Sequence, residues 1–302
     1  MHDFRPMTGK KKSWTILKLL KWTTSYFKSH SIESSRSAAE ILLAQALKIK
    51  RIDLYLNYDQ PLVSAELKLF KSLIKRRVKR EPVAYIVGSK EFWSLPLTVN
   101  PAVLIPRPET ECLVEAILNL EDKSAGLDSK NILDLGTGSG AVVLALAHEK
   151  PQHIYFASDK SFDSICLARQ NALALHLEKN IIFLEADWFE PFCQNQALFD
   201  IIISNPPYIP TAKILRLEPE ICQFEPKGAL DGGQDGLTCL TKIIEQAPGF
   251  LKPGGSLLLE IGYDQKQALK KIIKKRDAYH DPVIIKDYSG HDRVVQIRKR
   301  DR

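Results

Sequence analysis

The spacing of apolar residues divides the chain into a helical front and an alternating rear. Over residues 13–80, apolar side chains recur every three or four positions, as in the stretch 16–27. We predict helices only for this segment, with a serine-rich cap at Ser34 and Ser35 and a further helix that starts at Pro61. The pattern therefore predicts a small helical bundle.

The segment that follows changes from helical to extended character. Residues 84–88 and 92–99 are short runs rich in β-branched, aromatic and leucine residues, and Gly88 and Ser89 join them. This predicts a β-hairpin that bridges two domains. Pro108 then stands where a first helical turn tolerates proline, which predicts that a helix begins there.

From residue 131 onward, strand-like apolar runs alternate with helical patterns. Such alternation is typical of a parallel sheet with helices on both faces. Two short strands close the chain, and the turn at 289–292 indicates that one of them runs antiparallel. The predicted strands are 131–135, 153–158, 181–185, 199–203, 256–261, 283–285 and 294–297, and the predicted helices are 140–149, 161–177, 237–250 and 264–275.

Charge is unevenly distributed along the 302 residues. Residues 1–80 contain 18 Lys and Arg against 6 Asp and Glu, a net charge of +12, whereas the remainder carries −5. A basic front suggests an acidic partner, such as nucleic acid or a ribosome-associated protein. A solvated basic surface without a partner agrees equally well with charge alone.

The placement of cysteine and histidine argues against disulfides and metal sites. The five cysteines form no Cys-x-x-Cys and the seven histidines no His-Glu-x-x-His. We therefore predict no metal and a reducing, cytoplasmic location. No apolar run approaches the roughly 20 residues of a membrane span. The start of the chain does not resemble a signal peptide, so we expect no membrane partner.

The first candidate site is a glycine-rich loop directly after the strand at 131–135. It consists of Gly136, Thr137, Gly138, Ser139 and Gly140. Glycines let the backbone turn tightly and approach a ligand, and the next helix offers free N–H groups to an anion. With Ala141 the loop also fits the dinucleotide fingerprint Gly-x-Gly-x-x-Ala, so nicotinamide or flavin cofactors and S-adenosylmethionine all stay open. A tight turn without a ligand is the structural alternative.

Two further strand ends carry side chains suited to adenosine. Asp159 follows the second strand and can accept hydrogen bonds from both ribose hydroxyls, although capping the helix near Ser161 is an alternative role. Asp187 can accept a hydrogen bond from an adenine amino group, and the Trp188 indole can pack on the ring. Ligands of open α/β sheets bind at the carboxyl ends of the strands, so we expect these residues and the glycine loop at one site.

The fourth candidate is the tetrapeptide Asn205, Pro206, Pro207 and Tyr208, which follows an apolar strand. Proline cannot continue a sheet ladder, so the strand ends in a stiff loop. A Pro-Pro turn that merely closes a buried strand is one interpretation. The other is catalytic. If the Asn205 side-chain carbonyl and the Pro206 backbone carbonyl each accept one N–H, a planar amino group is held with its lone pair aimed at a methyl donor.

Several longer segments resemble the PrmC/HemK family of protein-glutamine N5-methyltransferases, which modify peptide chain release factors. Asn-Pro-Pro-Tyr alone is shared with adenine and cytosine-N4 DNA methyltransferases, whereas the segment 106–111 with the upstream 85–88 is far more specific. The segments that carry the resemblance are 81–88, 91–93, 104–111, 136–140, 187–189, 205–208, 225–226, 229–230, 260–262 and 287–288.

The resemblance implies a Rossmann-like α/β fold: a class I S-adenosylmethionine-dependent methyltransferase domain with a mixed seven-stranded sheet and a small N-terminal helical domain. Together with the patterns above, the resemblance divides the chain into three predicted parts. These are the helical domain at 1–83, the β-hairpin linker at 84–107 and the catalytic domain at 108–302. Residues 1–12 are left unaccounted for.

The same resemblance implies roles for the candidate residues. S-adenosyl-L-methionine, which leaves as S-adenosyl-L-homocysteine, would contact Gly136, Thr137, Gly138, Ser139, Gly140, Asp159, Asp187, Trp188 and Asn205. The glutamine of a Gly-Gly-Gln loop would be received by Asn205, Pro206, Pro207 and Tyr208, with Asn205, Pro206 and Tyr208 catalytic. The helical domain would dock class I peptide chain release factors. We expect a monomer without a stable nucleic-acid partner.

Two other functions compete with this one. A nucleic-acid methyltransferase acting on an exocyclic amine of the adenine N6 type fits the tetrapeptide and the basic front, but no large target-recognition domain follows or interrupts the catalytic domain. A non-enzymatic basic binding module is opposed by the intact glycine loop and Asn205. The chain itself contains Gly232, Gly233 and Gln234, which we interpret as a loop leading into the helix at 237 rather than as a self-methylation site.

Overall fold

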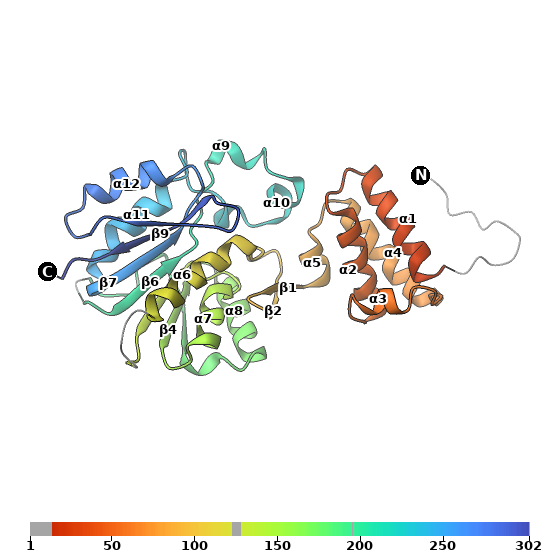
Figure 1. The fold of residues 1–302 in the computed structure, drawn as a ribbon, viewed down its shortest axis with the longest axis horizontal. Coiled ribbons are helices and arrows are strands. Elements are labelled where there is room, and N and C mark those ends of the chain that lie inside the picture. Colours follow the sequence, from red (N-terminus) through yellow and green to blue (C-terminus); the bar gives the residue numbers. More distant parts are fainter. Residues whose placement is uncertain (1–13, 123–127, 195, 302) are drawn as a thin grey trace, which may run out of the picture. The chain divides into compact units, whose positions relative to one another are not determined.

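The computed structural model describes residues 14–122, 128–194 and 196–301, which belong to two compact units (Figure 1). Unit 1 is Met1–Val87 and unit 2 is Gly88–Arg302. The first unit therefore extends to Val87 rather than to residue 83. Residues 1–12, to which the sequence assigns no role, lie outside the described residues. No helix within the described ranges is both long enough and apolar enough to span a bilayer.

Unit 1 contains helices and, among its described residues, no strand, as predicted. Its helices are α1 (Ile16–Ser29), α2 (Ser35–Leu47), α3 (Asp53–Leu56), α4 (Ser64–Val78) and α5 (Val83–Val87). The apolar stripes of α1, α2 and α4 meet in one buried core that includes Phe27, Leu42 and Phe70. Fully burying such a side chain contributes roughly 1.5–3 kcal/mol, which is why the apolar spacing identifies these helices.

Two helix starts in unit 1 differ from the prediction. Ser34 precedes α2 but adopts a left-handed conformation with φ 49°, and its side chain makes no capping hydrogen bond. Helix α4 begins three residues after Pro61, because the Glu66 carboxylate accepts a hydrogen bond from Val63 N at 2.9 Å and caps the helix there. Pro61 instead forms an isolated antiparallel bridge with Thr15.

The predicted β-hairpin linker is shifted, and its first predicted strand is wrong. The run 84–87 belongs to helix α5, in which Ile86 N donates to Pro82 O at 3.0 Å. An apolar run this short has no period that separates a strand from a helix. The antiparallel hairpin strands are β1 (Ser89–Phe92) and β2 (Leu95–Thr98). Trp93 and Ser94, left-handed at φ 52° and 58°, form its two-residue turn.

Unit 2 is built on a mixed seven-stranded sheet with the order β5-β4-β3-β6-β7-β9-β8 (Figure 1). The first five of these strands are parallel, and β9 is antiparallel to both neighbours, as predicted for one of the last two strands. The strands are β3 (Asn131–Leu135), β4 (Ile154–Asp159), β5 (Ile181–Glu185), β6 (Phe199–Ser204), β7 (Leu251–Glu260), β8 (Val283–Lys286) and β9 (Asp292–Arg298). Each strand predicted from residue 131 onward is present.

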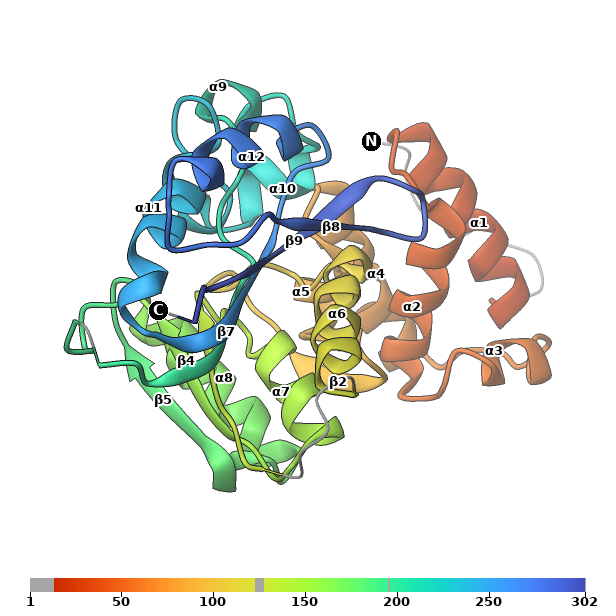
Figure 2. The ribbon, with the colours of Figure 1, turned by 60° about the vertical axis from the view of Figure 1, so that its left-hand side comes forward.

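Helices cover both faces of this sheet (Figures 1 and 2). Helices α6, α7 and α8 bury their apolar residues in one cluster, and α11 and α12 bury theirs in another. Their bounds are α6 (Glu111–Asp122), α7 (Ala141–Glu149), α8 (Phe162–Ala174), α11 (Thr238–Gln246) and α12 (Lys266–Lys274). The pattern does not predict α9 (Thr211–Ile214) or α10 (Pro219–Phe224), because one or two turns are too short to show an apolar period.

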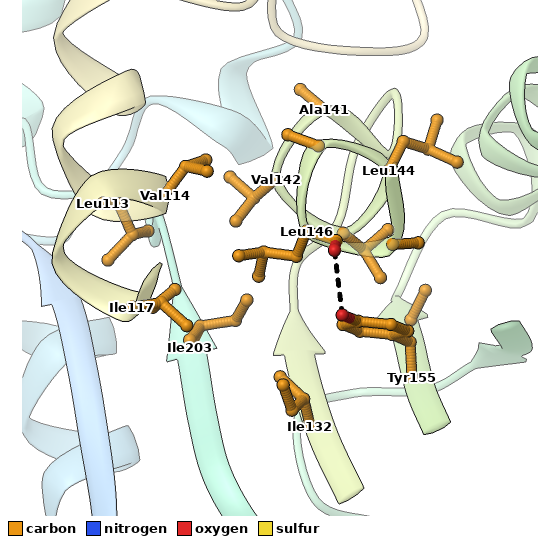
Figure 3. Packing of buried hydrophobic residues seen from close by; sticks show 14 of the residues in the cluster. Leu113, Val114, Ile117, Ile132, Ala141, Val142, Leu144, Leu146, Tyr155 and Ile203 are labelled. Atoms are coloured by element: carbon orange, nitrogen blue, oxygen red, sulfur yellow. Dashed lines mark hydrogen bonds between the residues drawn. The ribbon is translucent and has the colours of Figure 1, made fainter. Parts of the chain in front are cut away.

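The cluster under α6, α7 and α8 fixes the strands that lead to the cavity described below (Figure 3). Leu113 and Ile117 of α6 pack with Ile203 of β6. Tyr155 of β4 is completely buried, and its hydroxyl donates to Leu146 O of α7 at 2.9 Å. This bond satisfies the polar end of the ring inside an apolar layer, where an unpaired hydroxyl is costly.

The strand order creates a topological switch between β3 and β6. The chain proceeds from β3 outward through β4 to β5 and then returns to β6 on the other side of β3. Leu135 and Ser204 are paired in register, and the Ser204 hydroxyl donates to Leu135 O at 2.6 Å. The loops after β3 and β6 therefore leave the sheet side by side, at the place where open α/β sheets bind ligands.

A buried asparagine ties the β-hairpin to the glycine loop. Asn171 of α8 is 1% exposed. Its Nδ2 donates to Thr98 O at 3.0 Å and to Ser139 O at 2.9 Å, and its Oδ1 accepts from Thr98 N at 2.8 Å. One side chain thereby holds β2 and the loop after β3 against the same helix.

We expect Asn171→Ala to lower the free energy of unfolding by about 2–4 kcal/mol, because three backbone groups lose a buried hydrogen-bond partner. Urea denaturation of the full chain measures this loss. The exposed Asn180 provides the control, since its side chain bonds a single carbonyl, Pro151 O. Asn180→Ala should cost about 0.5 kcal/mol or less. Equal losses in the two variants would contradict the role of Asn171.

Candidate active site

A cavity of about 720 Å³ opens at the carboxyl ends of β3, β4, β5 and β6. Nine of the predicted site residues line it, and they come from the last residue of β4 and from the loops after β3, β5 and β6. These residues are Gly136, Thr137, Gly138, Ser139, Asp159, Asp187, Trp188, Asn205 and Pro207. The structure therefore brings the glycine loop, the two predicted acids, the indole and the asparagine together.

Three predicted site residues are not among the residues that line the cavity. Gly140 precedes α7 with φ 83°, and a Cβ there would press on side chains of α7 and α8, so its role is close packing. Pro206 is buried. The Tyr208 hydroxyl donates to Glu260 Oε1 at 3.0 Å, and burial together with the Glu260 carboxyl raises the pKa of this phenol. Tyr208 thus anchors the tetrapeptide to the sheet.

The glycine loop leaves open space on its cavity side. Gly136 and Gly138 have left-handed φ values of 71° and 56°, which glycine adopts without strain. A Cβ on either residue would meet no atom within 4 Å. The loop is held from the sheet side, where Gly136 N and Thr137 N donate to Ser158 O at 2.8 and 2.9 Å. A ligand can therefore lie directly against this backbone.

Two acids stand beside the loop. Asp134 is 3% exposed and accepts from Thr137 Oγ1 at 2.7 Å, and burial raises its pKa to about 7. Asp159 accepts from Gly138 N and Ser161 N, both at 2.9 Å, and burial raises its pKa as well. Ser161 itself caps α8, so Asp159 is not the capping residue. The pair favours a ligand with hydrogen-bond donors or positive charge.

Asp187 is already paired within the protein. Lys160 Nζ at 2.8 Å and Lys242 Nζ at 3.2 Å contact its two oxygens, and the Lys160 bond holds the pKa of this carboxyl below its usual range. Both lysines line the cavity, although no local pattern in the sequence predicts them. Trp188 has φ 58°, which is uncommon for a bulky residue. Within the described ranges, no group of three His, Cys, Asp or Glu side chains is suited to hold a metal ion.

Asn205 presents its side-chain amide to the cavity at the end of β6. Its Nδ2 donates to Thr110 Oγ1 at 3.1 Å. Its Oδ1 accepts no hydrogen bond from any residue that the structure describes. Thr110 closes the short 3₁₀ helix Pro108–Thr110 and also lines the cavity. The site therefore offers an unused carbonyl acceptor close to the glycine loop.

An ion pair joins two loops that enclose the cavity. Arg107 Nη2 lies 2.5 Å from Glu225 Oε1, and the Glu225 carboxyl is buried. Arg107 lines the cavity, as do Pro106 and Ala229 near the two partners. Sequence reasoning does not identify this pair, Thr110 or Asp134 as site residues. The available signal was that segments 104–111, 225–226 and 229–230 share motifs with one enzyme family.

Comparison with known proteins identifies that family. The family model described as the PrmC N-terminal domain matches residues 18–88, and a methyltransferase-domain model matches residues 127–300. The release factor glutamine methyltransferase of Geobacter sulfurreducens is 41% identical over 289 residues, which cover 96% of this chain and 98% of that relative. This chain belongs to the release factor glutamine methyltransferase family. The family member of Salmonella typhimurium is 42% identical over 264 residues, which cover 87% and 92%.

A solved structure agrees with the fold of this family member. The hMettl16 catalytic domain in complex with MAT2A 3'UTR hairpin 6 aligns with a TM-score of 0.55 and 14% identity, over 74% of this chain and 81% of that chain. Identity this low shows the fold alone. With the two family models, it confirms the predicted class I methyltransferase fold, its mixed seven-stranded sheet and its N-terminal helical domain.

Two glycines, Gly232 and Gly236, lie in close contact with the backbone of the tetrapeptide. A Cβ on Gly232 would lie 2.8 Å from both Pro207 O and Tyr208 Cα, and one on Gly236 would collide with Tyr208 O. Gln265 Nε2 donates to Tyr208 O at 3.0 Å and to Gly236 O at 2.9 Å. Because Gly232 and Gly236 have no side chains, the backbone of Pro207 and Tyr208 can pack directly against the backbone of these two glycines.

We expect Gly232→Ala to lower the free energy of unfolding by about 1–3 kcal/mol, because the added methyl displaces backbone atoms of the tetrapeptide. Gly228→Ala serves as the control, since a Cβ at Gly228 would meet nothing within 4 Å. That variant should change stability by about 1 kcal/mol at most, in the stabilising direction. Urea denaturation of both variants gives the comparison, and an unchanged Gly232→Ala would rule out the close packing.

Proposed function

We propose that this protein transfers a methyl group from S-adenosyl-L-methionine to the side-chain amide nitrogen N5 of the glutamine in the Gly-Gly-Gln loop of peptide chain release factors. The observation that carries the proposal is the carboxamide of Asn205. Its oxygen accepts no hydrogen bond from the described residues and stands at the cavity that the glycine loop also lines. Identity of 41% over 96% of the chain to a relative named for this activity supports the choice of substrate.

The cavity offers groups that match S-adenosyl-L-methionine, which supplies an electrophilic methyl group on a sulfonium. Gly136 and Gly138 leave room for a ligand against the backbone. Asp159 has lone pairs left for ribose hydroxyls beyond the two amides that it already binds. Positive charge on the ligand would favour the ionised form of Asp134. Trp188 provides an apolar surface for the adenine ring.

The acceptor amide would be held by carbonyl groups of the tetrapeptide. The lone pair of a carboxamide nitrogen is delocalised, so the nitrogen is a poor nucleophile. When Asn205 Oδ1 and Pro206 O each accept one N–H, they direct that lone pair toward the methyl donor. Orientation of this kind lowers the barrier by several kcal/mol, as an order of magnitude. The donor loses its positive charge during transfer, so the proton can leave the nitrogen afterwards.

The helical domain supplies a docking surface in this proposal. Its net positive charge suits an acidic partner, and the relatives that share this domain are named for release factors. Part of the basic helix end at 75–80 serves the fold instead. Arg76 bonds Glu81, and the buried Arg77 donates to Glu81 O. Lys75 and Lys79 are exposed and are the residues of this end that we assign to docking.

Labelled S-adenosyl-L-methionine tests the proposal directly. We expect label on a class I release factor and none on the same factor with its loop glutamine changed to alanine. DNA and RNA in parallel reactions should stay unlabelled. Label on nucleic acid would favour methylation of an exocyclic amine, and label that survives loss of the glutamine would contradict the proposed acceptor.

Two controls belong to the same assay. Asn205→Ala should lower turnover about 100-fold or more through loss of acceptor alignment, while isothermal titration calorimetry should find cofactor binding largely intact. Wild-type turnover in this variant would remove Asn205 from the mechanism. Gln234 is exposed and is not among the cavity-lining residues. Mass spectrometry of the enzyme after incubation should therefore find Gln234 unmethylated.

Cofactor affinity should depend on pH through Asp134. Its pKa of about 7 means that the carboxyl is mostly protonated at pH 6 and mostly ionised at pH 8. A positively charged ligand binds the ionised form better, so the affinity falls as the pH is lowered. We expect the dissociation constant to rise about tenfold from pH 8 to pH 6, and Asp134→Asn to bind with little pH dependence. Calorimetry at both pH values measures the dissociation constant of wild type and of Asp134→Asn. An equal change with pH in the two proteins would show that Asp134 is not the group responsible.

A further inference from the structure

Gly228 is a glycine that neither the backbone nor the packing of the fold requires. It lies in the 3₁₀ turn Lys227–Ala229, and its φ is outside the left-handed range that favours glycine. A Cβ on this residue would meet no atom within 4 Å. In a helical turn, glycine is less stable than alanine by roughly 0.5–1 kcal/mol. Because Gly228 is exposed and lines the cavity, this open space is available to a ligand.

Hydrogen bonds place Gly228 at the end of the cavity that contains the tetrapeptide. The segment after it runs beside the residue that follows Tyr208. Ile209 N donates to Leu230 O at 3.1 Å, and Gly232 N donates to Ile209 O at 2.9 Å. The acids and the indole that are suited to adenosine come instead from the end of β4 and from the loop after β5. The space beside Gly228 is therefore on the acceptor side.

Arg107 reaches this side of the cavity from the loop that precedes α6. Its Nη2 lies 2.5 Å from Oε1 of Glu225, and the two side chains are 32% and 1% exposed. The buried carboxylate holds the guanidinium in place. A guanidinium carries five N–H groups, so Arg107 has donors left for a ligand. Arg107 and Gly228, which we call the mouth, both line the cavity and are both reached from solvent.

The charges around the cavity favour an uncharged ligand at the mouth over a polyanion. Among the described residues that line the cavity, the cations are Arg107, Lys160 and Lys242. Each is paired with a carboxylate, which is Glu225 for the arginine and Asp187 for both lysines. A nucleic-acid strand binds through cations that neutralise its phosphates, and these cations are already neutralised. A polypeptide main chain is uncharged and needs only N–H donors for its carbonyl groups.

We propose that the mouth binds the main chain of the polypeptide segment that carries the acceptor glutamine. Gly228 leaves room for this main chain to pass, and Arg107 donates an N–H group to one of its carbonyl oxygens. Glu225 is a positioning residue, because it holds the guanidinium. The inference rests on the proposed function and deepens it. It names the backbone of the Gly-Gly-Gln segment as a part of the substrate that the catalytic domain recognises in addition to the glutamine side chain.

Gly228→Leu fills the mouth, and Gln223→Leu is its matched control. Gln223 is exposed and is not among the residues that line the cavity. We expect Gly228→Leu to raise the KM for release factor about tenfold or more, because leucine occupies the path of the main chain. Its dissociation constant for S-adenosyl-L-methionine, measured by calorimetry, should equal that of wild type. Gln223→Leu should change neither quantity.

Thermal melting shows whether each variant is folded. Should Gly228→Leu fail to fold, Gly228→Ala takes its place, since a Cβ fits at this position without contact. The expected rise in the KM for release factor is then about threefold. Because alanine is at least as stable as glycine in a helical turn, loss of stability cannot cause this rise.

Arg107→Lys tests the guanidinium while it keeps a positive charge beside Glu225. Lysine can pair with the carboxylate but lacks the planar fork that donates to two acceptors at once. We expect the KM for release factor to rise about fivefold, which corresponds to the loss of one hydrogen bond. The dissociation constant for cofactor should stay at the wild-type value. A role of Arg107 that is limited to the ion pair would leave the KM unchanged.

The outcomes separate this inference from the proposed function. A wild-type KM in Gly228→Leu, or a rise only in the dissociation constant for cofactor, would overturn the mouth as the acceptor path and leave the methylation of release factors intact. A wild-type KM in Arg107→Lys would overturn the contact made by Arg107. Label on single-stranded DNA that is lost in Gly228→Leu would assign the mouth to nucleic acid. If the wild-type protein puts no label on release factor, the proposed function fails and this inference fails with it.

Discussion

The parallel pairing of β3 with β6 is the constraint on which the site depends. Its register sets Leu135 beside Ser204, so the glycine loop and Asn205 start one strand spacing apart, about 4.8 Å. A slip by one residue would turn every side chain of β6 to the opposite face. The two apolar clusters oppose such a slip, because Ile202 is buried in one and Ile203 in the other. In the proposed function, the methyl donor at the glycine loop and the acceptor amide at Asn205 must lie within a few ångströms, and this core fixes that arrangement.

Two carboxyl groups near the cavity are buried in a way that lowers the stability of the fold. Glu225 Oε2 and Glu260 Oε2 are buried and have no hydrogen-bond partner among the described residues. An unsatisfied buried acceptor costs about 1–3 kcal/mol. Glu225 is paired with Arg107, which lines the cavity, and Glu260 accepts the hydrogen bond of Tyr208 in the tetrapeptide. These two buried carboxyls therefore lower the stability of the fold at the edge of the sheet where the proposed site lies.

Much of the sheet was predictable because its signals are local. Runs such as 131–135 and 181–185 are bounded by turn residues and match β3 and β5 residue for residue. The run 84–87 failed because a short apolar stretch fits a helical turn as well as a strand. The predicted site residues met because parallel strands end at one edge. Thr110 was missed because its partner Asn205 lies 95 residues away, and no local pattern encodes such a contact.

The chemistry of the tetrapeptide does not by itself select a glutamine. Two carbonyl groups that accept two N–H donors serve a carboxamide and an adenine amine alike. The chain's own Gly-Gly-Gln sequence shows that this tripeptide is also insufficient, because Gly232 is committed to packing against Pro207 and Gln234 stays outside the cavity lining. In a substrate, by contrast, the glycines beside the glutamine must not be packed into the fold, so that the glutamine can enter the cavity. In the proposed function, selectivity then lies in access and in docking beyond the tetrapeptide, for which we propose the basic helical domain.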